Sequence, residues 1–300
     1  MRFSLAVPTL GRSSELLRLL DSLDAQEFRD FEVIFVDQNE DDRLTPILSQ
    51  PRSFEIRHLR TPGERGVSRG RNIGWMNARG DYVVFTDDDC WYPPTLLAAV
   101  HRQIEATQAD VVAGRPTDET GRSINGRFQT RAQWVNRVTV WTTQIEWLTF
   151  FRRTALQRLG GFDEGIGLGS PSPYQAAEGQ DISLRALSLG MTIYYDPTLN
   201  GHHAELNLST PGEDMIRKGR IYGRGMGFTL GRFGYGPVMA LYWISRSLFN
   251  AVTAALSGNR ARRRYFTGQA IGRASGWLAG VADRRRGPQR QLQLTLPATS

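Results

Sequence analysis

Short apolar runs alternate with longer amphipathic segments along the first part of the chain. Runs rich in β-branched and aromatic residues predict strands at residues 3–7, 31–36, 54–59, 81–86 and 110–114. Between them, apolar residues three or four positions apart predict helices starting near Ser14, within 65–79 and over 94–108. This alternation predicts an α/β domain with a largely parallel sheet.

The pattern is less regular after residue 114. Residues 115–140 show no period and predict no element, and the aromatic residues of 141–151 indicate core packing rather than a platform for a sugar. A loop rich in Gly, Pro and Ser then leads into a helix predicted over 182–189, and a strand is predicted over 192–195. The remaining predicted elements are helical, at 213–234, at 237–256 and in the Gly-rich stretch that ends at 282.

Three consecutive carboxylates, Asp87, Asp88 and Asp89, follow the strand predicted over 81–86. Like charges crowded at one strand end repel each other, so such a cluster usually needs a cation. Asp oxygens suit Mg²⁺ or Mn²⁺, which can in turn hold the phosphates of a substrate. A solvated acidic turn fits the three residues equally well when they are considered alone.

Polar side chains also follow the other predicted strands. Thr9 and Arg12 follow the first strand, Asp37 follows the second and Asp87 follows the fourth. Ligands of parallel α/β sheets bind beyond the carboxyl ends of the strands. Asp37 alone also fits a turn or cap residue, but four polar residues converging on one sheet edge predict a nucleotide pocket.

Four motifs occur in order along this region: Val7-Pro8-Thr9, Phe35-Val36-Asp37, Arg71-Asn72-Ile73-Gly74 with Ala78-Arg79-Gly80-Asp81, and Phe85-Thr86-Asp87-Asp88-Asp89. Together they resemble the signature of family 2 glycosyltransferases of the GT-A fold, over residues 1 to about 205. The resemblance implies a Rossmann-like, mostly parallel sheet flanked by helices, here with a helical C-terminal extension. The family's metal motif, Asp-any-Asp, corresponds to Asp87 and Asp89, and Thr86 stands where an aliphatic residue is common.

The resemblance also implies roles for residues between positions 178 and 203. The family's catalytic base, an Asp at the start of a helix, corresponds to Asp181, although an ordinary helix cap fits this residue too. Gln180 stands where the family has Glu, and Glu178 is a candidate substitute. The His that often completes the family's metal site corresponds to His203 rather than His202.

The activity implied by the resemblance is metal-dependent transfer of a sugar, with inversion, from a nucleotide-diphosphate donor. The acceptor would be a hydroxyl of a lipid-linked or polysaccharide molecule, and Asp181 would deprotonate it. Mg²⁺ or Mn²⁺ held by Asp87, Asp89 and His203 would neutralise the leaving diphosphate. The residues expected to contact the nucleotide sugar are Pro8, Thr9, Arg12, Asp37, Arg71, Asn72, Asp87 and Asp88.

Charge is distributed unevenly along the chain. Residues 217–300 contain 15 of the 37 Lys and Arg residues and one acidic residue, which gives +14, whereas residues 1–216 carry −7. This asymmetry predicts a globular body with a basic region that faces an anionic membrane or nucleic acid. Because the apolar window at 237–256 contains Arg246 and several polar residues, an amphipathic helix lying on a membrane is favoured over a membrane span.

A single cysteine, Cys90, excludes an internal disulfide framework and fits a reducing cytosol; packing beneath the Asp cluster is its expected role. The first strand is not preceded by a signal-peptide pattern, so we expect a bacterial protein attached peripherally to the cytoplasmic face of the inner membrane. The expected domains are a catalytic domain (1–210) with a nucleotide-sugar half (1–114) and an acceptor half (115–210), a basic membrane-associating region (211–282) and a disordered tail (283–300).

Two other classes of protein share parts of this pattern. A sugar nucleotidyltransferase uses a related sheet, but the first strand is not followed by a Gly-rich phosphate loop, since Gly11 stands alone there. A non-catalytic protein that binds membranes or nucleic acid would explain the basic C-terminal region. The aromatic residues of that region alternate with aliphatic ones, as in lipid contact, so nucleic acid is not an expected partner. The sequence does not identify the donor sugar, the nucleobase of the donor or the acceptor. It does not predict the oligomeric state either.

Overall fold

The computed structural model describes residues 1–286, and the chain folds into two compact units. The first unit comprises Met1–Phe162 and Ile182–Leu206, and the second comprises Asp163–Asp181 and the residues from Asn207 onward. The loop that the sequence placed in the acceptor half therefore groups with the C-terminal helices. Most of the predicted disordered tail lies outside the described residues, and its first residues, 283–285, are helical.

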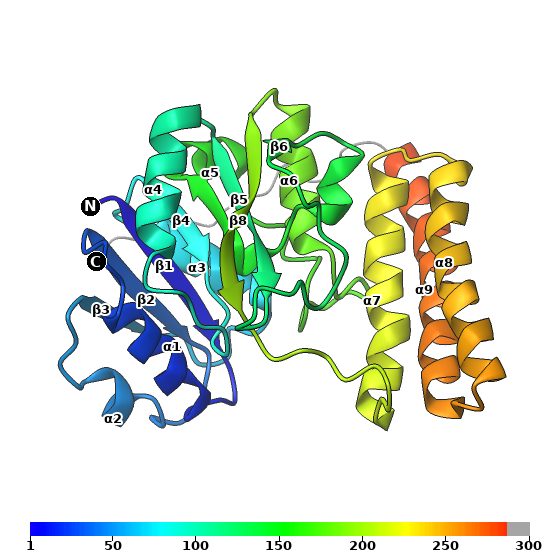
Figure 1. Cartoon of the computed structure of the whole chain (residues 1–300), viewed down its shortest axis with the longest axis horizontal. Helices are drawn as coiled ribbons and strands as arrows, with labels where there is room; N and C mark the ends of the chain where they lie inside the picture. The colour runs from blue at the N-terminus through cyan, green and yellow to red at the C-terminus, as the bar shows by residue number, and fades with distance from the viewer. Residues whose placement is uncertain (287–300) are drawn as a thin grey trace. The chain divides into compact units, whose positions relative to one another are not determined.

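In the described part of the chain, the first unit is built on an eight-stranded sheet (Figure 1). The spatial order is β3 (Glu55–Arg60), β2 (Phe31–Asp37), β1 (Phe3–Thr9), β4 (Tyr82–Phe85), β7 (Thr149–Arg152), β5 (Val111–Thr117), β8 (Ile193–His202) and β6 (Gln133–Trp134). Strands β3, β2, β1 and β4 pair in parallel, as do β5 and β8, whereas β7 and β6 run antiparallel to their neighbours. The predicted α/β fold with a mostly parallel sheet is confirmed.

Helices cover both faces of this sheet, which explains why β1, β2 and β4 are buried throughout. Leu5 and Val7 of β1 share a core cluster with apolar residues of α1 (Glu15–Asp24) and α4 (Leu96–Thr107). On the other face, α3 (Val67–Met76) lies so close to β1 that a Cβ on Gly74 would be 2.6 Å from the Cβ of Ala6. The glycine of the Arg71–Gly74 motif is therefore required for packing α3 against β1.

Several elements differ from the prediction. The first unit also contains α2 (Thr45–Leu48), α5 (Arg153–Leu159), the strands β6 and β7 and two 3₁₀ turns, Thr139–Thr142 and Glu146–Leu148, none of which the apolar pattern predicted. The four residues of β7 are too few to show a period. Their aromatic side chains Phe150 and Phe151 are buried, as is Trp147, which confirms the predicted packing role for these three residues, whereas Trp141 is half-buried.

Strand β8 is longer than the strand predicted over 192–195, because it continues beyond Pro197 to His202. Its register with β5 shifts between Ala113 and Arg115, which leaves the residues around Pro197 in an irregularity of the ladder. A proline, which has no N–H to donate, is tolerated at such a place. Pairing with β5 then resumes up to His202, so the irregularity decides where the end of β8 lies.

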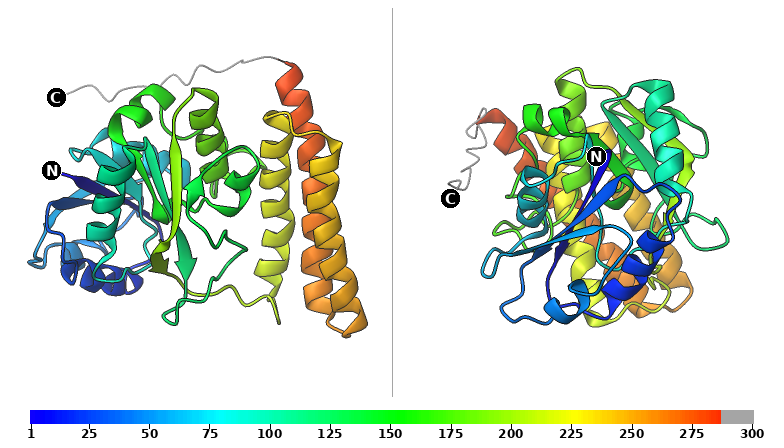
Figure 2. Two further views of the ribbon diagram at one scale, coloured as in Figure 1. Left: turned by 45° about the horizontal axis from the view of Figure 1, so that its top comes forward. Right: turned by 90° about the vertical axis from the view of Figure 1, so that its left-hand side faces the viewer.

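The second unit is dominated by three helices, α7 (Glu213–Arg232), α8 (Pro237–Leu256) and α9 (Arg260–Arg285). Helix α9 lies side by side with both α7 and α8 (Figures 1 and 2). The three helices predicted from the sequence are confirmed. Among the described residues, no helix has both the length and the apolar character needed to cross a membrane.

The contact between α7 and α9 is made by glycines spaced four residues apart. They are Gly219, Gly223, Gly227 and Gly231 on α7, and Gly272, Gly276 and Gly280 on α9. A Cβ on Gly227 would lie 2.2 Å from the carbonyl oxygen of Arg273, and one on Gly276 would lie 2.2 Å from that of Arg224. The two backbones are therefore in direct contact, and even a methyl group does not fit between them.

Replacing Gly276 with alanine is expected to destabilise the second unit by about 1–3 kcal/mol, the usual cost of overpacking. Gly268 of the same helix supplies a matched control, because a Cβ there would meet its nearest neighbour at 3.5 Å, an ordinary contact. Gly268→Ala should leave stability unchanged or raise it by up to about 1 kcal/mol through helix propensity. Chemical denaturation of both variants measures the difference, and equal stabilities would refute the close contact.

Candidate active site

Three segments of the first unit bring charged side chains together at the carboxyl end of β4. The turn after β4 carries Asp87 and Asp89, the loop after β1 carries Arg12, and His203 follows the last residue of β8. The backbone of His202 pairs with that of Trp91 through hydrogen bonds of 3.0 and 2.8 Å. This short antiparallel bridge fastens the end of β8 to the loop that follows the Asp cluster.

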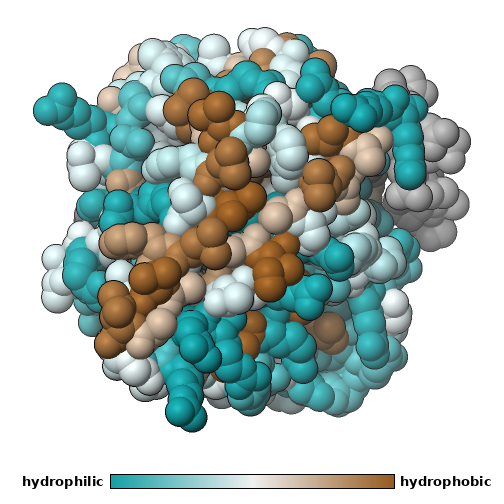
Figure 3. Space-filling model, turned by 90° about the vertical axis from the view of Figure 1, so that its right-hand side faces the viewer, coloured by the Kyte–Doolittle hydropathy of each residue, from teal (hydrophilic) through white to brown (hydrophobic). Residues whose placement is uncertain are grey.

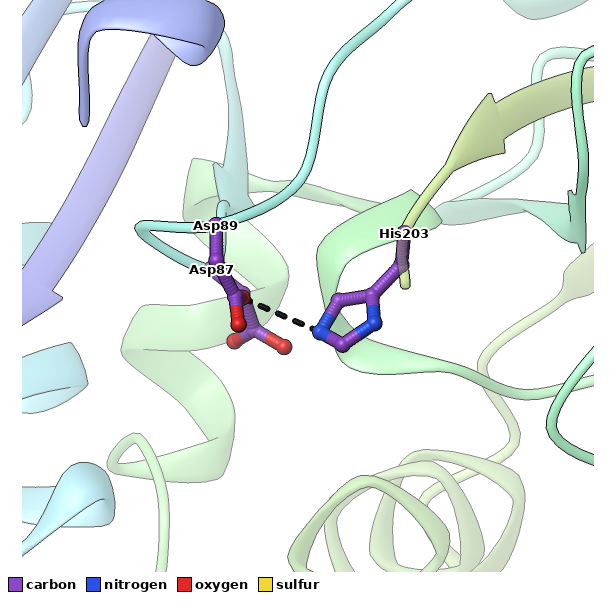
Figure 4. Close-up of side chains that lie close together, drawn as sticks. All are labelled: Asp87, Asp89 and His203. Atoms are coloured by element: carbon purple, nitrogen blue, oxygen red, sulfur yellow. Dashed lines mark ion pairs between the residues drawn. The ribbon is translucent and has the colours of Figure 1, made fainter. Parts of the chain in front are cut away.

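The carboxylates of Asp87 and Asp89 and the imidazole of His203 form a group suited to a metal ion (Figure 4). Each residue offers one ligand atom, and these atoms lie within 4.8 Å of one another. His203 Nε2 lies 3.0 Å from Asp89 Oδ1, and its Nδ1 lies 2.7 Å from the carbonyl oxygen of Ala204. A backbone carbonyl that holds Nδ1–H directs Nε2 toward the carboxylates, as is common for metal-binding histidines.

The same three groups perturb one another electrostatically. Burial by itself would lower the pKa of His203, but the hydrogen bond and charge of Asp89 outweigh it and raise that pKa to about 9. Burial would likewise raise the pKa of Asp89, but His203 and Arg12 hold it below its usual value. A cation is thus strongly favoured beside Asp89.

Asp88 and Arg12 form a second ion pair beside this group. Arg12 Nη1 lies 2.5 Å from Asp88 Oδ1 and 2.5 Å from Asp89 Oδ2. Burial raises the pKa of Asp88 to about 6 in spite of the hydrogen bonds and the arginine charge that act against it. The guanidinium therefore joins the loop after β1 to the Asp cluster, and its predicted contact with the nucleotide sugar stays a prediction.

The Arg71-Asn72 pair of α3 is buried next to the cluster. Arg71 Nη2 lies 3.4 Å from Asp87 Oδ1, and its guanidinium carbon lies 5.4 Å from the ring centre of Phe162. Asn72 donates to the carbonyl of Phe162 at 3.0 Å and accepts from its N–H at 2.8 Å. These bonds fix the backbone at Phe162, whose ring meets Phe85 edge to face. Whether either residue also contacts the donor stays a prediction.

Asp37 ends β2 and is fully buried. Its carboxylate accepts hydrogen bonds from the backbone and side chain of Asn39, at 3.0 and 2.7 Å, and lies 2.9 Å from His58 Nε2. Asn39 in turn accepts from the N–H of Gly11 at 2.7 Å, so the loops after β1 and β2 are tied together. Asn39 and His58 were not predicted, because neither belongs to a motif.

The remaining predicted residues of this unit lie where the sequence suggested. Pro8 and Thr9 are buried at the end of β1. Cys90 is fully buried, and its thiol donates to the carbonyl of Asp87 at 3.1 Å. Burial raises the pKa of this thiol well above its ordinary value, so it stays protonated. The expected packing role of Cys90 beneath the Asp cluster is confirmed.

Asp181 belongs to the second unit and is almost completely buried. It lies in α6 (Glu178–Ser188), and its N–H donates to the carbonyl of Ala177 at 2.9 Å. The helix therefore begins three residues before Asp181, and the alternative interpretation of this residue as a helix cap is wrong. Its predicted role as the base is not tested by these contacts.

A mostly parallel sheet of this topology, with an Asp-any-Asp motif after β4, defines the class of GT-A glycosyltransferases. Residues 4–171 match the family described as Glycosyl transferase family 2. That match covers more than half of the chain, and the chain belongs to this family.

Part of the chain is similar in sequence to other bacterial glycosyltransferases. An uncharacterized glycosyltransferase of Haemophilus influenzae is 34% identical over 102 residues, which are 34% of each chain. The poly(ribitol-phosphate) beta-N-acetylglucosaminyltransferase TarS of Staphylococcus aureus is 29% identical over 129 residues, which are 41% of this chain and 22% of TarS. The matches thus cover about a third or less of these relatives' lengths.

Solved structures extend the likeness over nearly the whole chain. A TarS fragment, residues 1–349, superposes with a TM-score of 0.56 at 18% identity and covers 97% of this chain and 93% of the fragment. The mannosyltransferase PcManGT of Pyrobaculum calidifontis, solved with GDP-Man and Mn²⁺, gives 0.62 at 17% identity, with 94% and 88% covered. At these identities the likeness shows the fold.

Proposed function

We propose that the protein transfers a sugar, with inversion, from a nucleotide-diphosphate sugar to a hydroxyl of a lipid-linked or polysaccharide acceptor. The observation that carries the proposal is the convergence of Asp87, Asp89 and His203 after β4 of a GT-A sheet. Similar proteins support the donor class, since TarS has been solved with UDP-GlcNAc and PcManGT with GDP-Man.

The ligand atoms offered by Asp87, Asp89 and His203 are of the kinds that bind Mg²⁺ or Mn²⁺. Two carboxylates and one imidazole suit Mn²⁺ well, and Asp87, Asp89 and His203 would hold the ion where it could also bind the phosphates of a substrate. When bound, the ion would act as a Lewis acid that offsets the charge of the departing diphosphate. The carbonyl of Ala204 holds His203 in the orientation that such binding needs.

Side chains of the protein would accept the acceptor's proton and bind the nucleotide sugar. Asp181 is proposed to accept the proton of the acceptor hydroxyl as that oxygen attacks the sugar from the face opposite the diphosphate. Arg12 and Arg71 lie beside the cluster and suit the phosphates, because planar guanidinium groups pair with phosphate oxygens through two hydrogen bonds. Pro8, Thr9, Asp37, Asn72 and Asp88 are proposed to shape the nucleotide-sugar pocket around them.

A panel of nucleotide-diphosphate sugars tests this function. Each donor is incubated with Mn²⁺ or Mg²⁺ and with lipid-linked and glycan acceptors, and mass spectrometry detects the nucleoside diphosphate and the glycosylated acceptor. A sugar nucleotidyltransferase would instead form pyrophosphate, so a parallel incubation supplies a sugar 1-phosphate and a nucleoside triphosphate. Pyrophosphate formed there, with no sugar transferred from any donor of the panel, would overturn the proposal.

The second unit supports a further proposal, peripheral attachment to an anionic membrane at the cytoplasmic face of a bacterial inner membrane. One side of α8 is exposed and apolar, and its side chains form a band across the surface (Figure 3). The band consists of Val238, Leu241, Tyr242, Leu248, Phe249, Val252 and Leu256. Apart from a gap at Ser245, these positions follow helical spacing, as in a helix that lies in the head-group plane.

The positive charge of this region supports an anionic lipid surface as the partner of the apolar band. Residues 217–300 carry a net charge of +14, and arginines near a bilayer gain about 1 kcal/mol each from anionic head groups. Arg246 of α8 lies close to the band, with its guanidinium carbon 5.8 Å from the ring centre of Tyr242 and its Nη1 3.1 Å from the Tyr242 hydroxyl. Long basic side chains of this kind reach head groups while their stems cover apolar surface.

Replacing Phe249 with glutamate is expected to weaken binding to anionic liposomes about tenfold or more, because a carboxylate at the centre of the band must leave water. Val138, which is 65% exposed in the first unit, provides the control Val138→Glu, which should bind normally. High salt should weaken wild-type binding without abolishing it, since salt does not screen the apolar contact. Flotation with liposomes measures all three effects. A wild-type protein that stays in the soluble fraction, or dimerises through α8, would contradict the proposal.

A further inference from the structure

Arg232, the last residue of α7, is surrounded by carboxylates of the second unit. Its Nη1 lies 2.6 Å from Asp163 Oδ2 and 3.4 Å from Asp181 Oδ1, and its Nε lies 3.7 Å from Asp283 Oδ2. These partners come from three parts of the chain: the loop after α5, the first turn of α6, and α9. The guanidinium therefore connects the C-terminal helices to the proposed catalytic base.

The burial of these groups makes the interaction strong. The side chain of Asp181 is 1% exposed and that of Asp163 is 17% exposed. Burial by itself would lower the pKa of the Arg232 guanidinium, but the charge of Asp181 and the hydrogen bond to Asp163 outweigh it and raise that pKa. A carboxylate as buried as Asp181 is costly to ionise without a nearby cation.

The backbone before Asp181 is also held in an uncommon conformation. Ala177, which precedes α6, has a φ of +71°, in the left-handed region that residues with a Cβ seldom adopt. Its carbonyl accepts the N–H of Asp181 at 2.9 Å. Strained backbone of this kind tends to persist at functional sites, where the surroundings impose it. The first turn of α6 is thus fixed by its backbone as well as by Arg232.

We infer that Arg232 is a positioning residue, which holds the Asp181 carboxylate ionised and oriented to accept the acceptor's proton. The inference rests on the proposed function. Glu178 lies three residues earlier on α6 and is acidic, and Arg185, one turn later, donates to the carbonyls of Leu159 and Gly161.

The pH dependence of kcat for sugar transfer tests this role with substitutions of opposite expected effect. Arg232→Met removes the guanidinium that contacts the Asp181 carboxylate, so the acidic limb of the profile should move to higher pH by about one unit or more. In Asp163→Asn the nearest competing carboxylate is lost and Arg232 keeps Asp181 and the more distant Asp283, so the limb should move to lower pH. Arg232→Lys keeps the charge without the planar fork and should fall between wild type and Arg232→Met.

Arg52→Met is the matched control. Arg52 also joins two aspartates, Asp21 and Asp24, at 2.6 and 2.7 Å, and its side chain is 11% exposed. This substitution should leave the acidic limb unmoved. Donor dissociation constants, measured by calorimetry, should stay within about twofold of wild type in the Arg232 and Asp163 variants, because only the proton transfer is affected.

A purely structural role for Arg232 predicts equal loss of kcat at every pH, and that result would overturn the inference. If Arg232→Met does not fold, Asp163→Asn decides the question: an acidic limb that stays in place or moves to higher pH refutes it. Asp181→Asn separates this inference from the proposed function. Retained turnover in that variant would remove Asp181 as the base, whereas an inactive Asp181→Asn with an unmoved limb in Arg232→Met would refute the role of Arg232 alone.

Discussion

Replacing Asp89 with alanine is expected to reduce kcat for sugar transfer by about 10³-fold or more, because preorganised charge stabilisation is the largest single contribution at such sites. Asp89 lies 3.0 Å from His203 and 2.5 Å from Arg12, so it joins the metal group to the loop after β1. Steady-state kinetics with the best donor, at saturating Mn²⁺, measure the loss.

The fold should survive this substitution, since the Asp89 side chain is 22% exposed and Arg12 keeps its pairing with Asp88. Asp21→Ala is the matched control. Asp21 is an exposed aspartate that also pairs with an arginine, and Arg52 keeps its second partner Asp24. The control should retain full activity. If the Asp89→Ala variant has a wild-type melting temperature and an unchanged kcat, Asp89 is not required for sugar transfer.

Replacing Asp181 with asparagine is expected to lower kcat by about 10²–10⁴-fold, the usual contribution of a general base, with donor affinity unchanged. Asparagine keeps the size of the side chain, but it cannot accept the proton. Steady-state kinetics and donor binding by calorimetry together separate the two effects.

Glu178→Gln provides the comparison for Asp181→Asn, because Glu178 lies in the same first turn of α6 and was the candidate substitute for the family's Glu. It should cost much less than Asp181→Asn. A fall in donor affinity with unchanged kcat would make Asp181 a pocket residue. Retention of the anomeric configuration in the product would independently contradict direct displacement by a deprotonated acceptor.

Strands β1, β2 and β4 could be predicted because parallel strands buried on both faces leave continuous apolar runs. Phe31–Asp37 is a clear case, since all seven residues are buried and the polar loop follows directly. The antiparallel β7 could not be found in this way. It consists of four residues that follow a 3₁₀ turn, and its pairing partners β4 and β5 are distant in the sequence.

The position of His203 shows where sequence reasoning needed the family resemblance. Apolar patterning ended the last strand of the sheet at residue 195, yet β8 continues to His202 past an irregularity at Pro197. The bridge between His202 and Trp91 then brings His203 to the Asp cluster. A long-range backbone pairing of this kind has no local signal in the sequence.

The glycines of α7 and α9 carried a signal that the prediction did not use. Their four-residue spacing places them on one face of each helix, and such a face lets two backbones touch. The sequence analysis noted only that the stretch ending at residue 282 is rich in glycine. Helix α8 has the exposed apolar face, whereas α7 supplies Arg232 to the proposed base.

This division of roles changes how the C-terminal helices should be tested. Deleting them would remove the apolar band and Arg232 together, so a loss of activity would not show which one matters. Phe249→Glu alters the band and keeps Arg232, whereas Arg232→Met removes the ion pairs of Arg232, including the one with Asp181, and keeps the band. Point substitutions therefore separate membrane attachment from catalysis.

Metal dependence is the measurement that tests the central proposal most directly. The protein is stripped of metal with EDTA, Mn²⁺ is titrated back, and turnover of the best nucleotide-sugar donor is followed. The grouping of Asp87, Asp89 and His203 predicts turnover close to zero without metal and a saturable return as Mn²⁺ is added. Full turnover in excess EDTA would contradict a metal-dependent glycosyltransferase site at the end of β4.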